Sequence, residues 1–179
     1  MQKDKPKKKA MRGFIIGDKI IDFGQVYRIF KIQKEKSTED KREKVLYFRP
    51  YYKNEHNKDL VCSIPAANIK LTQIRKPASK KKIKHLLGRL AAKRSKNKPP
   101  SALQAKEKLK LNSPTITAKT LKMFWLDKQD PLTNFTSNKQ DLLELTMSRL
   151  VEEVAFVFQI PLAKARRKIN HALDKGSKK

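Results

Sequence analysis

The sequence predicts an α+β fold in which a small β-barrel of the Tudor or SH3 type precedes an all-α domain of about four to five helices. Residues 14–64 contain short runs of β-branched and aromatic residues separated by turn residues, which is typical of a small, strongly bent barrel. After residue 75 the apolar residues recur at helical spacing. The 179 residues are enough for two small domains. We therefore expect a flexible basic arm at 1–13, a barrel domain at 14–75 and a helical domain at 76–179.

The strand boundaries follow from turn residues. Gly17-Asp18 and Phe23-Gly24 are expected to form turns between the first strands. The next strand, at 25–32, alternates apolar and polar residues, so one of its faces can be buried. Residues 33–44 are strongly charged and predict a hairpin loop. Further strands are expected at 45–49 and 60–64, and Pro65 closes the last one.

The first three helices are marked by caps and prolines. Ser79 is expected to cap the first helix. A Pro-Pro break separates this helix from a short second one at 102–111. Ser113 followed by Pro114 predicts the start of a third helix, because proline is favoured at the first helical position. Trp125, near the end of that helix, is predicted to lie in the core.

Two further helices complete the predicted domain. Ser137 and Gln140 have the spacing of a capping box and predict the start of a long helix rich in leucine and valine. Pro161 is expected to open the last helix. The second half of the chain therefore reads as a helical bundle.

Charge is the strongest functional signal in the sequence. Lys and Arg number 44 against 17 Asp and Glu, which gives a formal net charge of +27. No acidic residue occurs between Asp59 and Glu107, whereas residues 127–158 contain six acidic and only three basic residues. This local reversal argues against a uniformly solvated lysine-rich surface. The most common partner of a strongly positive protein surface is the phosphate backbone of a nucleic acid.

Aromatic residues are scarce in the basic region, so stacking on single strands is not expected there and duplex DNA is favoured over unpaired RNA. Binding through phosphates would depend strongly on salt and little on sequence. The predicted DNA-binding residues lie on two helices, their connection and the last helix: Lys93, Arg94, Lys96, Lys98, Lys106, Lys110, Arg166 and Arg167.

The sequence offers no pattern of an enzyme, so we assign no catalytic residue. One cysteine and three scattered histidines provide no metal-site spacing, and a Gly-rich phosphate loop is missing, so we expect neither a metal nor a cofactor. Cys62 is predicted to be a small buried side chain. No run of about 18 apolar residues and no signal-peptide core occurs. We expect a cytoplasmic, nucleoid-associated monomer without a membrane partner.

Several segments together resemble a known family. They are FIIGDKIIDFGQVYRIFKI, VLYF, LVCSIPAANIKLTQIRKP and MSRLVEEVAFVFQIPLAKARRKINHAL. Within and between them lie Gly17-Asp18, Ile64-Pro65-x-x-Asn68, Asn112-Ser113-Pro114 and Leu150-Val151-x-Glu153. In this order they are similar to the CarD/CdnL family of bacterial transcription regulators, over most of the chain.

The resemblance implies a Tudor-like domain that binds the β-subunit lobe of RNA polymerase and a helical domain that contacts double-stranded promoter DNA. In the family the DNA contact lies near the upstream edge of the bubble and stabilises the open complex. By alignment, the polymerase would pair with the edge of the strand at 60–65 by strand addition. The residues implied are Leu60, Val61, Cys62, Ser63 and Ile64.

Two departures from the family pattern shape the expectation. Ser63 stands where many members carry an arginine, so the salt bridge made by that arginine is not expected. Lys98 stands where many members carry a tryptophan that wedges against the minor groove. Because a lysine can neutralise phosphate but cannot fill an unstacked step, we expect charge to matter more than insertion.

Two other functions remain open from the residues alone. A small β-barrel with a basic helical domain also suits an RNA-binding or ribosome-associated protein. A nucleoid-type protein that binds DNA without sequence preference would need only the basic half.

Overall fold

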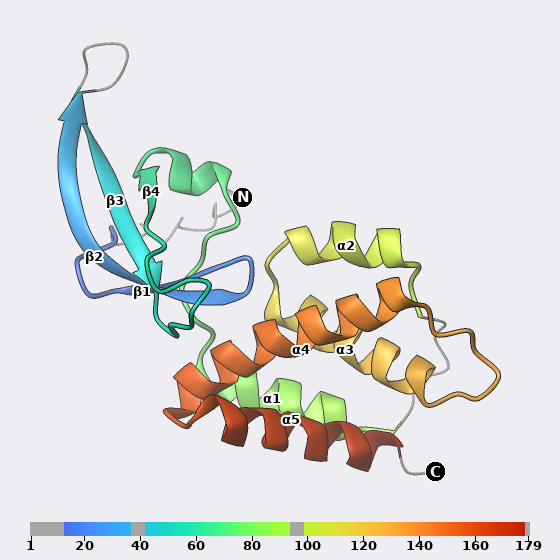
Figure 1. The fold of residues 1–179 in the computed structure, drawn as a ribbon. Coiled ribbons are helices and arrows are strands. Elements are labelled where there is room, and N and C mark those ends of the chain that lie inside the picture. Colours follow the sequence, from blue (N-terminus) through green and yellow to red (C-terminus); the bar gives the residue numbers. More distant parts are fainter. Residues whose placement is uncertain (1–12, 37–41, 94–98, 178–179) are drawn as a thin grey trace, which may run out of the picture.

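The chain forms a sheet region followed by a helical region, as Figure 1 shows. The computed structural model describes residues 13–36, 42–93 and 99–177. Four antiparallel strands and a short 3-10 helix come first, and five α-helices follow. The predicted α+β class and the order of the two regions are confirmed.

The sheet is open, which differs from the predicted barrel. Its strands are β1 (Lys19–Asp22), β2 (Gln25–Lys36), β3 (Arg42–Pro50) and β4 (Cys62–Pro65), in the spatial order β1-β2-β3-β4. Within the described residues β1 and β4 do not pair with each other. After Pro65 the chain turns into the helix η1 (Asn68–Leu71) instead of a further strand. Arg75 then meets Ile21 of β1 in an isolated bridge only.

One face of the sheet carries the N-terminal core. Tyr27 and Ile29 of β2 lie opposite Pro50 and Phe48 of β3, and Ile69 of η1 packs against the same cluster. The rings of Tyr27 and Phe48 meet edge to face, with their centroids 5.3 Å apart. The predicted alternation of β2 is confirmed as far as Ile29. A β-bulge between Ile29 and Lys31 then shifts the register by one residue.

The β2–β3 hairpin is longer than the sequence predicted. Residues 33–36 and 42–44 were expected in a loop, yet they continue the two strands away from the helices (Figure 1). The register places like charges directly opposite each other: Lys34 and Lys44, Glu35 and Glu43, Lys36 and Arg42. The core pairs fix the register of the two strands, and the main-chain hydrogen bonds continue in that register to the end of the hairpin. They form although the like-charged side chains opposite each other repel.

The five predicted helices are confirmed. They are α1 (Lys80–Ala91), α2 (Ala102–Lys110), α3 (Pro114–Lys128), α4 (Ser137–Phe158) and α5 (Leu162–Ser177). Trp125 of α3 packs against the helical core, as predicted.

The helix caps agree with the prediction only in part. The hydroxyl of Ser79 accepts a hydrogen bond from the backbone of Lys82 at 3.2 Å, as expected. The predicted capping box at the start of α4 is wrong, because Thr136 occupies the cap and Ser137 is already helical. A capping box does form at α2, between Ser101 and Gln104.

The helices pack around α4 and α3. Helices α1 and α5 lie side by side below them in Figure 1, whereas α2 lies above and packs on α3 and α4. Gly176 of α5 approaches the end of α1 so closely that a Cβ there would lie 2.3 Å from the Leu90 carbonyl oxygen. A larger residue would push the two helices apart. Among the described helices, none is long and apolar enough to cross a membrane.

Candidate functional site

The outer edge of β4 is open to another strand. The backbone N–H of Ala66 donates to the carbonyl of Lys44 in β3 at 2.7 Å. Antiparallel pairs alternate between bonded and non-bonded, so Cys62 and Ile64 turn their backbone groups toward β3. Val61 and Ser63 therefore present their N–H and C=O groups outward. No hydrogen bond from another described segment reaches this edge.

The side chains around this edge divide into exposed and half-buried residues. Leu60 is 43% and Val61 56% exposed, and Ser63 is exposed as well. Cys62 and Ile64 pack against the sheet core, although Cys62 is half-buried and not fully buried as predicted. Burial raises the pKa of the Cys62 thiol, and the charge of Asp22 adds to this shift. The thiol is therefore a poor nucleophile at neutral pH.

Helices α1 and α5 carry a cationic surface. Lys80 of α1 and Lys168 of α5 both lie over the ring of Phe158, at 5.7 and 5.8 Å from its centroid. We call the two helices the basic helix pair, after their exposed cations: Lys80, Lys81, Lys82, Lys84, Arg89, Lys164, Arg166, Arg167, Lys168 and Lys175. Their parallel packing gathers charges that are separated by about 80 positions in the sequence.

The predicted DNA-binding residues do not form one surface. Arg166 and Arg167 lie on α5, whereas Lys106 and Lys110 lie on α2, across the α3–α4 layer (Figure 1). The expected cations of the first two helices are separated in the structure, because α1 and α2 pack on different sides of α3 and α4. Lys93 follows α1 and is exposed. The predicted residues Arg94, Lys96 and Lys98 lie outside the described residues.

Two of the predicted cations are already paired. Lys110 bonds Glu107 on its own helix at 2.7 Å, and Arg166 bonds Glu144 of α4 at 2.5 Å. Both pairs are exposed, so they contribute little to stability. They nevertheless reduce the charge available to a phosphate, which favours Arg167 and its neighbours on the basic helix pair over Lys110.

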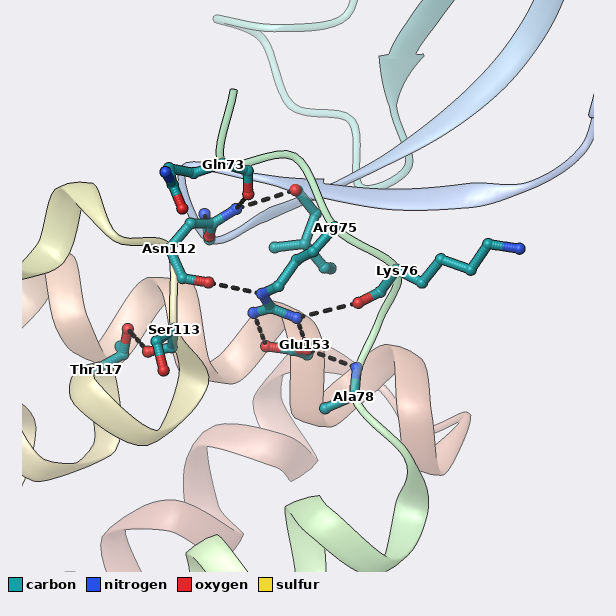
Figure 2. A network of polar contacts seen from close by, with 10 residues as sticks. Gln73, Arg75, Lys76, Ala78, Asn112, Ser113, Thr117 and Glu153 are labelled. Atoms are coloured by element: carbon teal, nitrogen blue, oxygen red, sulfur yellow. Dashed lines mark hydrogen bonds and ion pairs between the residues drawn. The ribbon is translucent and has the colours of Figure 1, made fainter. Parts of the chain in front are cut away.

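A buried polar network joins the sheet region to the helical region. Figure 2 shows the guanidinium of Arg75, which follows the sheet, directed at the carboxylate of Glu153 on α4. Two of its nitrogens donate to the two Glu153 oxygens at 2.6 and 2.8 Å, and Nε donates to the Asn112 carbonyl at 2.6 Å. The backbone N–H of Ala78 also donates to Glu153, at 2.8 Å. Glu153 is therefore satisfied although it is only 2% exposed.

Asn112, between α2 and α3, uses both ends of its amide in this network. Its Oδ1 accepts from the N–H of Gly24 at 2.9 Å, and its Nδ2 donates to the carbonyls of Ile21 and Gln73 at 3.0 and 2.9 Å. The residue is buried and has a φ of 47°, a conformation that asparagine tolerates better than most residues. Each side-chain bond of Asn112 reaches a backbone group of the sheet region.

Two charged side chains of α4, Arg149 and Glu152, are partly buried beside the β1–β2 turn. The carboxylate of Glu152 accepts from the N–H of Val26 at 2.9 Å. Burial raises the pKa of Glu152, and the hydrogen bond from Val26 opposes this shift in part. The Arg149 side chain lies so close to Gly24 that a Cβ there would be 2.5 Å from it, and burial lowers the pKa of Arg149. The two regions are therefore in contact through partly buried charged side chains of α4.

Sequence reasoning missed this junction. Asn112 and Glu153 were noticed only as parts of family-like motifs, without a physical role. One signal was present: Glu153 lies between Val151 and Val154 on an apolar helix face, where an acid needs a buried partner. The partner could not be chosen from the sequence, because Arg75 is 78 positions away.

The described residues hold no group of histidine, cysteine or acidic side chains that could bind a metal ion. No protein-family model matches the sequence, and no curated protein matches it. The functional conclusion therefore rests on the geometry of the β4 edge and of the basic helix pair, together with the motif resemblance described above.

Proposed function

We propose that this protein is a non-enzymatic transcription regulator that docks on the β-subunit lobe of RNA polymerase through β4 and holds double-stranded promoter DNA near the upstream edge of the bubble. The sheet region would be an open, Tudor-like variant of the fold that the family resemblance implies. The observation that carries the proposal is the free outer edge of β4, with the exposed side chains of Leu60 and Val61 beside it.

Strand addition gives this edge a simple mode of recognition. The N–H and C=O groups of Val61 and Ser63 can pair with an extended strand of the partner, which supplies affinity. The side chains of Leu60 and Val61 would set the choice of partner. Ser63 cannot form the salt bridge that an arginine would offer, so the backbone and these apolar groups carry the contact.

The basic helix pair is the surface that we assign to duplex DNA. Its lysines and arginines would contact phosphates, so the binding constant would fall steeply as salt rises and would depend little on sequence. Contacts that are stronger in the open promoter complex than in the closed one would shift the equilibrium toward the open state. A difference of about 1.4 kcal/mol changes that equilibrium about tenfold.

A proline substitution tests the docking edge. Ser63→Pro removes an outward N–H without taking a donor from the β3–β4 ladder. We expect it to weaken binding to an isolated polymerase β lobe at least about tenfold, because one main-chain bond is lost and the incoming strand meets the proline ring. Binding is measured by biolayer interferometry.

Ser63→Ala is the matched control, since it removes the hydroxyl and keeps the N–H; its affinity should stay within about twofold. Val61→Pro should repeat the loss at the second outward donor. If both proline variants fold and bind the lobe like wild type, β4 is not the docking edge. A freestanding nucleoid protein would show the same transcription effect with and without these substitutions.

A further inference from the structure

A second cationic surface lies on the sheet face that points away from the N-terminal core. Lys19 of β1 is opposite Arg28 of β2, and Arg28 is opposite Arg49 of β3. Residues paired in a ladder project to the same face, so the three cations form a row across three adjacent strands. Arg28 and Arg49 are exposed, and Lys19 is half-buried.

Aromatic rings lie between these cations. The β-bulge turns the ring of Phe30 to the same face, where it lies 6.5 Å from the ring of Tyr47 and beneath the guanidinium of Arg49, 5.2 Å away. Tyr51 follows β3, lies 5.9 Å from the ammonium of Lys19 and is 45% exposed. We call this surface the cation–ring face: Lys19, Arg28, Phe30, Tyr47, Arg49 and Tyr51.

The cation–ring face lacks the counter-charges found elsewhere on the molecule. On α2 and α5, Lys110 and Arg166 have carboxylate partners. Among the described residues, no carboxylate pairs with Arg28 or Arg49. Glu35, further along β2, already accepts a hydrogen bond from the hydroxyl of Tyr47. Like charges directly opposite each other in a sheet destabilise it, and an anionic partner would remove that cost.

We propose that the cation–ring face binds the unpaired nucleotides of a single-stranded nucleic acid. Phosphates would lie against Lys19, Arg28 and Arg49, and bases would stack on the three rings, since every base has a face that an aromatic ring can cover. In a duplex each base is stacked on its neighbours, so its faces are not available to stack on the aromatic rings. The three rings also pack within the protein, Tyr51 against Phe156 of α4, Phe30 under Arg49 and Tyr47 through its bond to Glu35. An acidic protein surface would use the cations alone and would leave the exposed part of the Tyr51 ring unused.

This inference goes beyond the proposed function, which places duplex DNA on the basic helix pair and polymerase on β4. It also differs from the expectation drawn from the sequence. Stacking was not expected because aromatic residues are scarce in the basic stretch of the chain, whereas the sheet brings rings and cations together from three strands. The binding of unpaired nucleotides needs no polymerase, so its failure would leave the β4 assignment untouched.

The test measures fluorescence anisotropy of labelled oligo-dT, oligo-rU and a DNA duplex with the full-length protein. Arg28→Gln combined with Arg49→Gln removes two charges from the face. Lys106→Gln combined with Lys108→Gln, on exposed positions of α2, removes the same charge elsewhere. We expect the first pair to weaken oligo-dT binding at least about tenfold, and the second pair no more than about threefold.

Tyr51→Leu tests the rings, because it keeps apolar bulk and removes the stacking surface. We expect at least about a fivefold loss for both single strands, persisting at high salt, with duplex binding unchanged. Intact folding is checked by circular dichroism and by the rate of thiol labelling at Cys62, which packs against the sheet core. A loss on oligo-rU alone would mean that the site prefers RNA within the same chemistry.

Two results would overturn the proposal. Equal losses for the two charge-matched pairs would show that only the overall field attracts the strand. A Tyr51→Leu protein with unchanged affinity, together with displacement of oligo-dT by poly-glutamate at equal charge, would show that the face accepts any polyanion, and an acidic protein would then be its better occupant.

Discussion

The side chain of Glu153 shows how a single buried acid can hold two regions together. It receives two bonds from Arg75 and one from the backbone of Ala78, although its own surroundings on α4 are apolar. Removing either charge would leave the other buried and without compensation, which usually costs more than the pair contributes. Glu153 is therefore more sensitive to substitution than the ion pairs on the surface.

The substitution Glu153→Gln should lower the free energy of unfolding by about 2–3 kcal/mol, because a neutral amide cannot compensate the partly buried guanidinium of Arg75. The measurement is urea denaturation followed by circular dichroism. Glu144→Gln is the control, since its pair with Arg166 is about half exposed on both sides and should change stability by less than about 1 kcal/mol. Equal effects of the two substitutions would contradict a special role for Glu153.

Glu152, the neighbour of Glu153, predicts that the stability of the protein depends on pH. Burial raises its pKa above the ordinary value of 4.5, so the folded state binds this proton more readily than the unfolded state does. The stability that Glu152 contributes is present below the unfolded pKa and is lost as pH rises through the folded pKa. Glu152→Gln should therefore stabilise the protein relative to wild type at pH 7 and change it less at pH 4.

This comparison is made from urea midpoints of both proteins at the two pH values. The glutamine can still accept the bond from Val26 through its amide oxygen, so the change isolates the charge. Burial also raises the pKa of Asp22, but this residue is present in both proteins and therefore adds the same pH dependence of stability to each. A variant that is less stable than wild type at pH 7 would contradict burial as the main cause.

Three helices began where a local signal in the sequence placed them, although the capping box expected at Ser137 failed and α4 is capped by Thr136. Ser79 capped α1, Pro114 began α3 and Pro161 preceded α5, because caps and prolines act within a few residues. The larger failures were non-local. The length of the β2–β3 hairpin depends on a register fixed by Ile29 and Phe48, far from the charged tip. Closure of the barrel failed because β4 is followed by η1.

If the basic helix pair binds duplex DNA, removing cations from α5 alone should weaken that binding. Arg167→Gln combined with Lys168→Gln should weaken duplex binding several-fold and reduce the slope of log K against log salt by about 2, since about 0.9 counterion is released per phosphate contact. The measurement is a salt titration with a fluorescent duplex.

Lys106→Gln combined with Lys108→Gln on α2 is again the charge-matched comparison. It should leave the salt slope for the duplex nearly unchanged if α2 lies outside the interface. Equal slopes for the two variants would show that duplex DNA is not confined to the basic helix pair.

At the scale of the whole molecule, the junction predicts one unfolding transition for both regions. Asn112 bonds the β1–β2 turn to the α2–α3 connection, and Glu153 of α4 bonds Arg75 of the sheet region, so neither region can open without exposing polar groups of the other. The sequence indicated two regions but not their contact, because the contact joins residues that are far apart in the chain and individually unremarkable.

The chain carries one natural probe in each region. Trp125 reports on the helical core, and Cys62 on β4 reports on the sheet through its rate of thiol labelling. In wild type the urea midpoints of the two probes should coincide. In Asn112→Ala they should separate, because the amide bonds to Ile21, Gln73 and Gly24 are lost while both cores remain intact. Separate midpoints already in wild type would contradict a cooperative junction.

The like-charged rungs at the end of the β2–β3 hairpin make ionic strength act on this protein in two opposing ways. Sliding the hairpin by one rung would set Lys34 beside Glu43 and Glu35 beside Arg42, but it would also turn the core residues outward. The like-charged pairs therefore destabilise this end of the hairpin, and added salt should stabilise it by screening the repulsion between them. The same salt would weaken the phosphate contacts that we propose for the basic helix pair, so this hairpin should be most rigid under the conditions in which the proposed binding is weakest.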